Sequence, residues 1–542
     1  MALRPQAATP PATNGTGNGA HPAELVSYDP ATGAELGRVP IRTGAEVRAA
    51  VARARAAQPA WAAQPLAVRL DYLRRIRAVL AEHADELSEL TAREMGKHPT
   101  EALLGDTLFS LTHLDYVIAM APRLLRPRRV RHGIVFATRY AQVVLDPRGV
   151  IGIISPYNYP VLMTANSLFM ALAAGNVVVA KPSEHTPLTV LKLAEICHTA
   201  GLPADVFQVL TGDHTTGAAL VDSDIDGLVF VGGTAAGRKI AAAAGARLLP
   251  VTMELGGNNA MIVLEDADLQ MAARAAIWGG FVTSGQVCGR AGRVLVAAPV
   301  AGRFLAAVTR EAEQVRHATQ VAEGVDMGPL TTAVSLAHVR MAVGEALEGG
   351  ARLVAGSLPL PGSTPGPALY PPTVLADVTP AMRVMREEIF GPVVCVYAVA
   401  DAAEAVRVAN DSPYSLTASV WSRDRRRAWR IARQVRAGSV LINEHLAPAL
   451  AAESPWGGMG GASGYGRIGG PLGLLSLTNP KYISYDRLPV RRYPWWFPYT
   501  PRTHELGRTL VALLYGRTLG IRLAAVRALL ADLPGLVRMF RG

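Results

Sequence analysis

The chain has 542 residues, of which half are apolar and 18% are charged, and its formal net charge is +11. Enough apolar residues are present to build a core, which excludes an intrinsically disordered protein, and the length predicts two to four domains at about 100–200 residues each. Three scattered cysteines exclude a disulfide scaffold and a cysteine-rich zinc site, and no apolar run approaches the ~20 residues of a membrane-spanning helix.

The N-terminal end, residues 1–22, is rich in Ala, Pro, Thr, Gly and Asn and poor in large apolar side chains, so we expect a disordered leader there. It has no basic segment followed by an apolar block, which predicts no signal peptide and a soluble, cytoplasmic protein. From about Val47 to Glu89 the apolar residues recur at helical spacing.

Short strands rich in β-branched residues are predicted next, at 150–154, 177–180, 206–210 and 227–231. Helical segments connect them, and the segment from Val161 to Ala173 is long enough for one helix. Strands that alternate with helices are typical of an open parallel sheet covered on both faces. This part of the chain is therefore predicted to be an α/β domain.

A second series of strands is predicted after residue 256, at 260–264, 293–296, 393–396 and 439–442. It indicates a second α/β domain that begins near Gly256.

The basic residues gather at the C-terminal end. From Lys481 onward eleven basic residues stand against three acidic ones, a net charge of +8, which leaves +3 for residues 1–480. Because the body of the chain is nearly neutral, we expect no nucleic-acid partner for it.

Cys288 is a candidate nucleophile. A lone cysteine is usually a buried structural thiol, but Gly285 and Gly289 flank this one and would let a substrate approach the sulfur closely. An ordinary thiol is only a few per cent ionised at pH 7, so a nearby base or positive dipole would help it to react.

Glu254 and Asn158 are the next candidates. Glu254 ends a predicted strand just before two glycines, at the sheet edge where ligands bind in α/β proteins, and could be a general base if burial raised its pKa. Asn158 follows the strand at 150–154 and could donate to an oxyanion, worth about 3–4 kcal/mol. Taken alone, each could equally be an ordinary turn residue.

The usual dinucleotide fingerprint G-x-G-x-x-G is absent. A looser glycine loop at 232–237 follows a strand and opens a helix whose amides could hold a pyrophosphate, although a structural turn explains it equally well. Lys181 and Glu184, at another strand end, suit the hydroxyls of a ribose, and the carboxylate would repel a 2′-phosphate.

Six segments together carry more information than any one of them: Ser155-Pro156-Tyr157-Asn158-Tyr159-Pro160, Lys181-Pro182-Ser183-Glu184, Glu254-Leu255-Gly256-Gly257-Asn258, Gly285-Gln286-Val287-Cys288, Glu388-Ile389-Phe390-Gly391-Pro392 and Pro455-Trp456-Gly457-Gly458. In this order and spacing, over roughly residues 24–485, they resemble the aldehyde dehydrogenase superfamily.

The resemblance implies an α/β fold with a Rossmann-like NAD-binding domain (23–124 and 148–255), an α/β catalytic domain (256–470) and a small β oligomerisation arm (125–147 and 471–485). The arm would join subunits into homodimers or homotetramers. The remaining residues, 486–542, would form a basic, aromatic, helical tail.

The resemblance also implies site roles and no metal. Cys288 matches the nucleophile, Glu254 the general base and Asn158 the oxyanion donor. The positions implied to line the NAD site are Ser155, Pro156, Tyr157, Lys181, Glu184, Gly232, Gly233, Thr234, Leu255, Glu388 and Phe390. Those implied to line the aldehyde tunnel are Tyr159, Met163, Val287 and Gly289.

The implied reaction is NAD-dependent oxidation of an aldehyde to a carboxylic acid. The Cys288 thiolate adds to the aldehyde carbon, a hydride leaves the thiohemiacetal for the nicotinamide, and water activated by Glu254 hydrolyses the thioester. Members that transfer the acyl group to coenzyme A typically lack this glutamate, so Glu254 favours hydrolysis. Glu184 favours NAD over NADP.

The sequence departs from the family's pattern at Ser167 and Ile468, where many relatives carry a lysine and a glutamate, which argues against a proton relay through them. No arginine marks a carboxylate anchor, which favours aromatic or aliphatic aldehydes over semialdehydes. Glu444 and His445 are interpreted as part of a surface loop.

The tail, about 57 residues beyond where most relatives end, has two interpretations. It packs on its own or a neighbouring subunit, or, as the alternative, residues 491–541 contact an anionic membrane surface through aromatic and basic side chains. Two rival functions stay open for the whole chain: a coenzyme-A-acylating enzyme and a catalytically silent scaffold.

Overall fold

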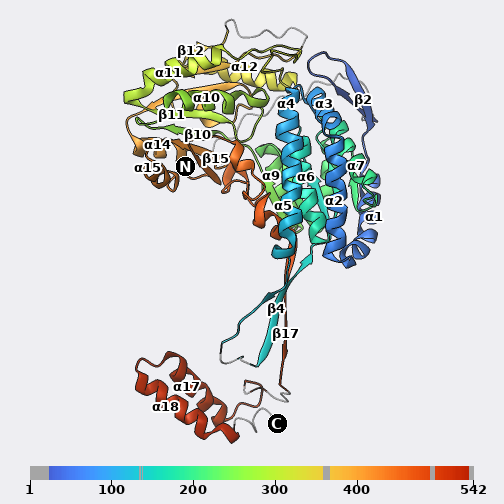
Figure 1. Cartoon of the computed structure of the whole chain (residues 1–542), viewed down its shortest axis with the longest axis vertical. Coiled ribbons are helices and arrows are strands. Elements are labelled where there is room, and N and C mark those ends of the chain that lie inside the picture. Colours follow the sequence, from blue (N-terminus) through green and yellow to red (C-terminus); the bar gives the residue numbers. More distant parts are fainter. Residues whose placement is uncertain are drawn as a thin grey trace. The chain divides into compact units, whose positions relative to one another are not determined.

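The computed structural model describes residues 23–133, 136, 138–357, 367–488, 493 and 495–535, and the predicted leader lies outside these ranges. The chain divides into two compact units, coloured along the sequence in Figure 1. Unit 1 comprises the chain up to residue 124 and residues 147–479, and unit 2 comprises residues 125–146 and those from 480 onward. Each unit is described by itself.

The first half of unit 1 contains these elements: β1 (Glu24–Tyr28), β2 (Glu35–Pro40), α1 (Gly44–Ala63), α2 (Leu66–Glu82), α3 (Ala84–Met95), α4 (Pro99–Glu101), the π-helix η1 (Ala102–Leu108), α5 (Phe109–Leu124), β5 (Val150–Ile154), α6 (Pro160–Ala174), β6 (Val177–Lys181), α7 (Pro187–Thr199), β7 (Phe207–Val209), α8 (His214–Asp222), β8 (Gly227–Val231), α9 (Thr234–Ala246) and β9 (Val251–Glu254).

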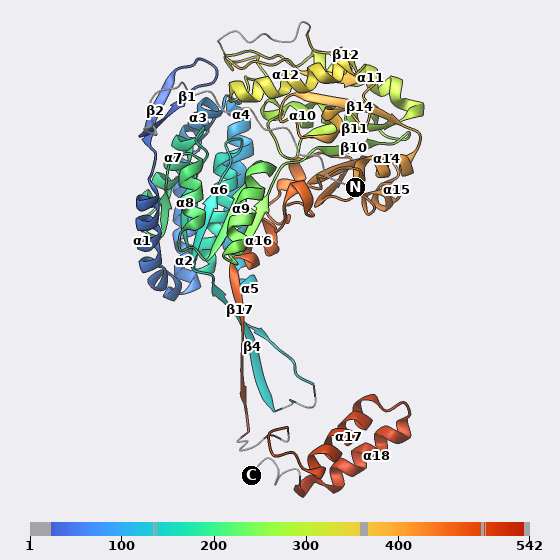
Figure 2. The ribbon, with the colours of Figure 1, turned by 180° about the vertical axis from the view of Figure 1, so that it is seen from behind.

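The strands of this half form a parallel sheet in the order β7-β6-β5-β8-β9. Helices α1, α6, α7, α8 and α9 pack against it, as Figures 1 and 2 show from opposite sides. The predicted α/β class is confirmed, and the helix predicted at 161–173 is α6. For β9 only the end at Glu254 was predicted and not the bounds, because its four residues mix polar and apolar side chains.

The second half of unit 1 contains these elements: β10 (Asn259–Val263), α10 (Leu269–Phe281), η3 (Val282–Gly285), β11 (Ala291–Ala297), α11 (Ala298–Glu313), α12 (Ala333–Glu348), β12 (Arg352–Ala355), β13 (Thr373–Ala376), α13 (Arg383–Arg386), β14 (Val393–Val399), α14 (Ala402–Asn410), β15 (Thr417–Trp421), α15 (Arg425–Ala432), β16 (Ser439–Ile442), η4 (Ala447–Leu450), η5 (Gly461–Ser463) and α16 (Gly470–Ser476).

The seven strands of this half have the order β12-β13-β14-β11-β10-β15-β16, and only β12 runs antiparallel to its neighbour. Alternate side chains of one strand enter two different apolar clusters. Ile262 of β10 belongs to the cluster that includes α12 and α14, whereas Met261 and Val263 belong to the cluster that includes α10 and α11. Because both faces are covered, the strand reads as a continuous apolar run, as predicted.

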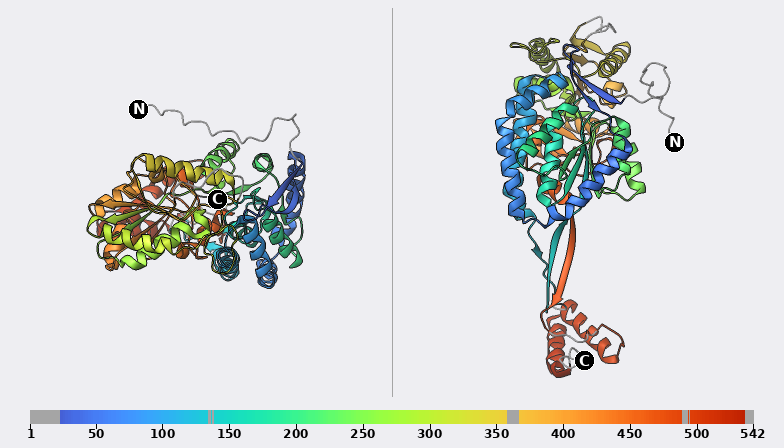
Figure 3. Two further views of the ribbon diagram at one scale, coloured as in Figure 1. Left: turned by 90° about the horizontal axis from the view of Figure 1, so that it is seen from above. Right: turned by 90° about the vertical axis from the view of Figure 1, so that its right-hand side faces the viewer.

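Unit 2 contains β3 (Arg128–Arg129), most of β4 (Arg139–Pro147) and of β17 (Thr478–Asp486), and the helices α17 (Pro501–Tyr515) and α18 (Leu519–Ala531). The strands form a three-stranded sheet in the order β17-β4-β3, and Figure 3 shows the two helices packed side by side. The side chains of Thr500 and Thr518 cap the two helices. The domain boundaries and the oligomerisation role of the arm stay predictions.

Candidate active site

A cavity of about 720 Å³ lies at the carboxyl edge of the five-stranded sheet. In the parallel register Ile154 stands beside both Lys181 and Phe230, and Val231 stands beside Glu254. The segments that follow these strand ends therefore meet at one edge, as the sequence predicted. Cys288, from the second half of unit 1, also lies on the cavity wall.

Cys288 sits in a tight connection between η3 and β11. Thr283 and Ser284 have a φ of 55°, and Gly285 has a φ of +71°. A Cβ on Gly285 would lie 2.2 Å from the Gly391 carbonyl, so only glycine fits this close approach. The connection leaves the Cys288 side chain partly exposed to the cavity.

The electrostatic surroundings keep the Cys288 thiol protonated in this state. Burial raises the pKa of Cys288 well above its usual value, and the neighbouring carboxyls of Glu254 and Glu388 raise it further. The nearest charges therefore oppose the thiolate, and a base must remove the proton when substrate is attacked.

Glu254 supplies a group suited to that task. It ends β9 and is 2% exposed, and its carboxylate accepts a hydrogen bond from Trp456 Nε1 at 3.1 Å. Burial raises the pKa of Glu254 to about 7, despite hydrogen bonds from Cys288 and Trp456 that lower it. The pKa thus lies in the range that a general base at neutral pH needs.

Asn158 lies in the turn between β5 and α6, on the wall of the same cavity. Its side-chain Nδ2 donates to the backbone oxygen of Gln286 at 2.9 Å. A primary amide has two N–H donors, so one remains for a ligand. The bond to Gln286 joins the Asn158 turn to the Cys288 connection.

The part of the cavity formed by β5, β6, β8 and α9 carries the predicted nucleotide positions. Of these, nine line the wall: Ser155, Pro156, Tyr157, Lys181, Glu184, Gly232, Gly233, Glu388 and Phe390. Two do not line the cavity, since the hydroxyl of Thr234 donates to the carbonyl of Ala462, and Leu255 packs against Gly237.

The residues present fit a pyridine nucleotide. The Ser155 hydroxyl is buried without a hydrogen-bond partner on the cavity wall, so a polar ligand would satisfy it. Lys181 Nζ lies 3.3 Å from the half-exposed Glu184 carboxylate, and this ion pair is open to a ribose. Although burial raises it, the pKa of Glu184 is lowered overall by Lys181 and nearby donors, which keeps the carboxylate charged.

The part of the cavity near Cys288 is apolar and aromatic. Three of the four predicted tunnel residues line it: Tyr159, Met163 and Val287. Sequence reasoning assigned no role to four further wall residues: Leu162, Leu446, Leu450 and Trp456. Trp456 stands in a recognised motif, but the others come from segments without a distinctive pattern.

The fourth predicted tunnel residue, Gly289, is not part of the wall. A Cβ there would lie 2.5 Å from Leu446 and 2.9 Å from Trp456, so Gly289 instead lets these two wall residues approach. Its carbonyl is hydrogen-bonded by His445 Nε2 at 3.1 Å. His445 is fully buried, and its interpretation as a surface-loop residue is wrong.

Comparison with known proteins agrees with this geometry. A family model described as the aldehyde dehydrogenase family matches residues 18–483. A putative succinate-semialdehyde dehydrogenase [NADP(+)] of Mycolicibacterium smegmatis is 38% identical over 84% of this chain and 88% of its own length. A 4,4′-diapolycopene aldehyde oxidase of Methylomonas is 35% identical over 91% of both chains. The NAD⁺ complex of a Bacillus cereus aldehyde dehydrogenase superposes with a TM-score of 0.81 at 31% identity, covering 85% of this chain and 93% of that one.

Fold and site define an α/β oxidoreductase that uses a pyridine nucleotide. The chain belongs to the aldehyde dehydrogenase family, and its reaction is the oxidation of an aldehyde to an acid.

Proposed function

We propose that this enzyme oxidises apolar aldehydes with NAD, through a covalent intermediate on Cys288 that is released by hydrolysis. The observation that carries the proposal is the convergence of Cys288, Glu254 and Asn158 on the wall of one cavity. Nucleophile, base and oxyanion donor are the three groups that acyl transfer through a thioester requires.

The protein's residues act in a defined order in this proposal. Glu254, with its pKa near 7, accepts the Cys288 proton, and the thiolate adds to the aldehyde carbon. The free N–H of the Asn158 amide and the backbone N–H of Cys288 donate to the oxyanion. When bound, the nicotinamide supplies the hydride acceptor. Glu254 next releases the Cys288 proton to solvent, and its carboxylate then takes a proton from the water that hydrolyses the thioester.

The preference for NAD rests on the charged Glu184 carboxylate, which would repel a 2′-phosphate. The curated relative from M. smegmatis is named as an NADP(+) enzyme, and the B. cereus structure contains NAD⁺, so relatives carry both cofactors. Turnover with NAD and with NADP therefore has to be compared.

The preference for apolar aldehydes rests on the wall near Cys288. Among the described residues that line the cavity, the basic side chains are Lys181, His214 and Lys239, and these belong to β6, α8 and α9 on the nucleotide side. A substrate carboxylate beside Cys288 would meet apolar side chains and Glu254. The name of the Methylomonas relative, whose substrate is a polyene aldehyde, is compatible with an apolar tunnel.

We expect kcat/KM to be at least tenfold higher for hexanal or benzaldehyde than for succinate semialdehyde, because an unpaired carboxylate costs more than ~1.4 kcal/mol to bury. The measurement is NADH or NADPH absorbance over an aldehyde panel, with NAD faster than NADP. A preference for succinate semialdehyde would contradict the apolar assignment. Product formation that requires coenzyme A would favour the acylating rival.

A second candidate function, attachment to a membrane surface, is favoured by the exposed apolar side chains of unit 2. Phe497 is 80% exposed, Tyr515 76% and Leu519 72%. The sequence ranges of unit 2 contain sixteen basic and four acidic residues, so they hold the chain's entire net positive charge. Anionic headgroups attract such segments by about 1 kcal/mol per basic residue near the surface. No described helix is long and apolar enough to cross a membrane.

We expect the full chain to float with vesicles that contain anionic lipid and not with purely zwitterionic ones, at low salt. The Phe497→Glu and Leu519→Glu exchanges should reduce flotation severalfold, because they place carboxylates in the apolar surface. The alternative is that a neighbouring subunit of a homodimer or homotetramer covers the exposed apolar side chains of unit 2. Flotation unchanged by both exchanges, with a changed oligomeric state in sedimentation, would favour the subunit over the membrane.

A further inference from the structure

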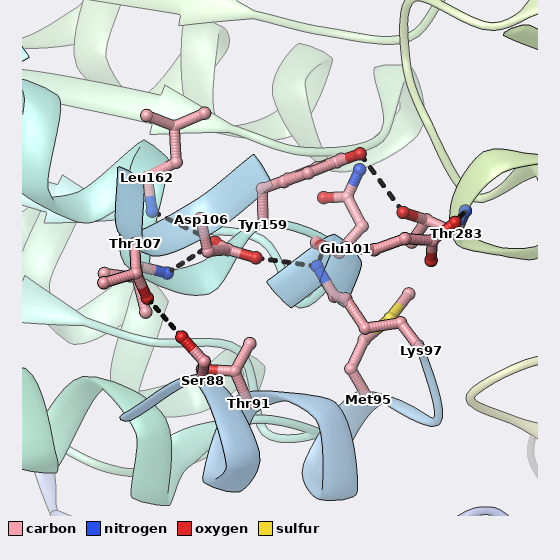
Figure 4. A network of polar contacts seen from close by, with 12 residues as sticks. Ser88, Thr91, Met95, Lys97, Glu101, Asp106, Thr107, Tyr159, Leu162 and Thr283 are labelled. Carbon is pink, nitrogen blue, oxygen red and sulfur yellow. Dashed lines mark hydrogen bonds and ion pairs between the residues drawn. The ribbon is translucent and has the colours of Figure 1, made fainter. Parts of the chain in front are cut away.

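A buried ion pair lies directly behind the Asn158 turn. Lys97 Nζ is 2.7 Å from Asp106 Oδ2, and neither side chain has any exposed surface. Lys97 follows α3, and Asp106 lies in the π-helix η1. Figure 4 shows this pair at the centre of a network of polar contacts. Removing two charges from water is costly, and this cost can exceed the attraction between them. A contribution to stability therefore does not by itself explain the pair.

The ammonium group of Lys97 makes three contacts in the structure. It donates to Asp106 Oδ2 and to the backbone oxygen of Asn158, the latter at 2.6 Å. Nζ also lies 4.2 Å from the centroid of the Tyr159 ring. Two of the three contacts thus fall on consecutive residues of the turn that carries the oxyanion donor.

Asp106 holds the other side of the same turn. Its Oδ1 accepts from the backbone N–H groups of Val161 and Leu162, at 3.2 and 3.1 Å. These belong to the first turn of α6, whose N–H groups have no partner within the helix. Lys97 and Asp106 therefore fix the chain immediately before and immediately after Tyr159.

The same segment also reaches the Cys288 connection. Glu101 accepts from the backbone N–H of Thr283 at 3.0 Å, and the hydroxyls of Tyr159 and Thr283 lie 3.1 Å apart. Thr283 is one of the three residues with positive φ that shortly precede Cys288. One stretch of chain, residues 97–106, therefore contacts both the turn of the oxyanion donor and the connection of the nucleophile.

We propose that the Lys97–Asp106 ion pair is a positioning device that orients the Asn158 amide toward the oxyanion. The inference rests on the proposed function, because it assigns Lys97 an effect through Asn158. Lys97 is a positioning residue, because its side chain is fully buried and does not line the cavity in which substrate and cofactor would bind.

A double-mutant cycle tests this inference. The measured quantity is the rate of the first turnover of NADH formation, which reports thiohemiacetal oxidation before hydrolysis. Asn158→Ala is expected to lower it about 10²–10³-fold, the loss of one oxyanion donor. Lys97→Met should lower it at least tenfold in the otherwise unchanged enzyme, but less than about threefold in the Asn158→Ala background. The Kd for NADH, from nucleotide fluorescence, should change less than twofold.

The controls separate positioning from general damage to the fold. Ser88→Ala removes the 2.8 Å hydrogen bond to the Thr107 hydroxyl at the far side of the same network and should leave the rate within twofold. If Lys97→Met does not fold, Asp106→Asn, nearly identical in shape, replaces it in the same cycle. If the fold-losses in first-turnover rate of the two single variants multiply in the double variant, the two residues act independently and the inference is overturned. An Asn158→Ala enzyme with the unchanged first-turnover rate would instead overturn the proposed role of Asn158.

Discussion

Replacing Cys288 by alanine is expected to lower aldehyde oxidation by at least about 10⁴-fold. The thiol is the only described nucleophilic sulfur on the cavity wall, and without it no covalent intermediate can form. The exchange removes one atom from a partly exposed side chain, so the fold should persist. The measurement is NADH absorbance in steady state and in the first turnover, with NAD binding followed separately.

Cys197→Ala is the matched control for this variant. Cys197 is fully buried in α7, where burial raises the pKa of its thiol strongly, and it lies outside the cavity. It should keep turnover within severalfold, while its stability falls slightly through lost packing. Full dehydrogenase activity in Cys288→Ala would reject the assignment of the nucleophile.

Replacing Glu254 by glutamine is expected to separate the two halves of the reaction. Glutamine keeps the shape but cannot accept a proton, so water activation should slow about 10²–10⁴-fold. The expected result is a burst of up to one NADH per active site, slower than in the unchanged enzyme because the Cys288 proton must then pass to solvent, followed by still slower steady-state turnover. Glu265→Gln, at an exposed ion pair with Arg427, is the matched control and should be unaffected. Steady-state turnover unchanged in Glu254→Gln would count against its role as the base.

The pH profile gives a second readout for Glu254. Because burial raises its pKa to about 7, the carboxyl is protonated below this value, and deacylation should rise as pH increases from 6 to 8. In the Glu254→Gln enzyme the deacylation rate should no longer rise between pH 6 and 8. Burial also raises the pKa of Glu388 to about 7, so this carboxyl ionises in the same pH range. If Glu254 causes the pH dependence, the deacylation rate of the Glu388→Gln enzyme must still rise between pH 6 and 8.

The sequence predicted the general layout of unit 1 because its strands are buried on both faces and therefore consist of continuous apolar runs. It also placed Glu254 and Asn158 correctly at strand ends, since the carboxyl ends of parallel strands share an edge. The strands β12, β13 and β15 were missed. They are only four or five residues long, and several of their residues are polar, so local periodicity carries little signal for them.

The contacts between distant segments could not be predicted in the same way. Gly289 looks like a tunnel residue because it adjoins Cys288. In the fold, however, Leu446 and Trp456, more than 150 residues away in the sequence, pack closely against it and line the cavity in its place. His445 looks exposed because the polar residues Asn443 and Glu444 precede it, but it is buried against the Gly289 carbonyl. Lys97 and Asp106 are nine residues apart, and only the folded chain shows that one bonds the carbonyl of Asn158 and the other the backbone N–H of Val161, on either side of Tyr159.

The wide helical turn that holds Asp106 limits how this stretch of the chain can vary in length. In η1 the hydrogen bonds join residues five apart instead of four, so the turn accommodates one more residue than a regular helix. Deleting a single residue there would let an ordinary helix re-form, with the following helix α5 in nearly the same phase, because the wide turn absorbs the extra residue. The Asp106 carboxylate, inside this stretch, would lose the direction that the wide turn gives it and with it the contact to its ammonium partner. Insertions and deletions should therefore be tolerated in surface loops but not in this seven-residue stretch.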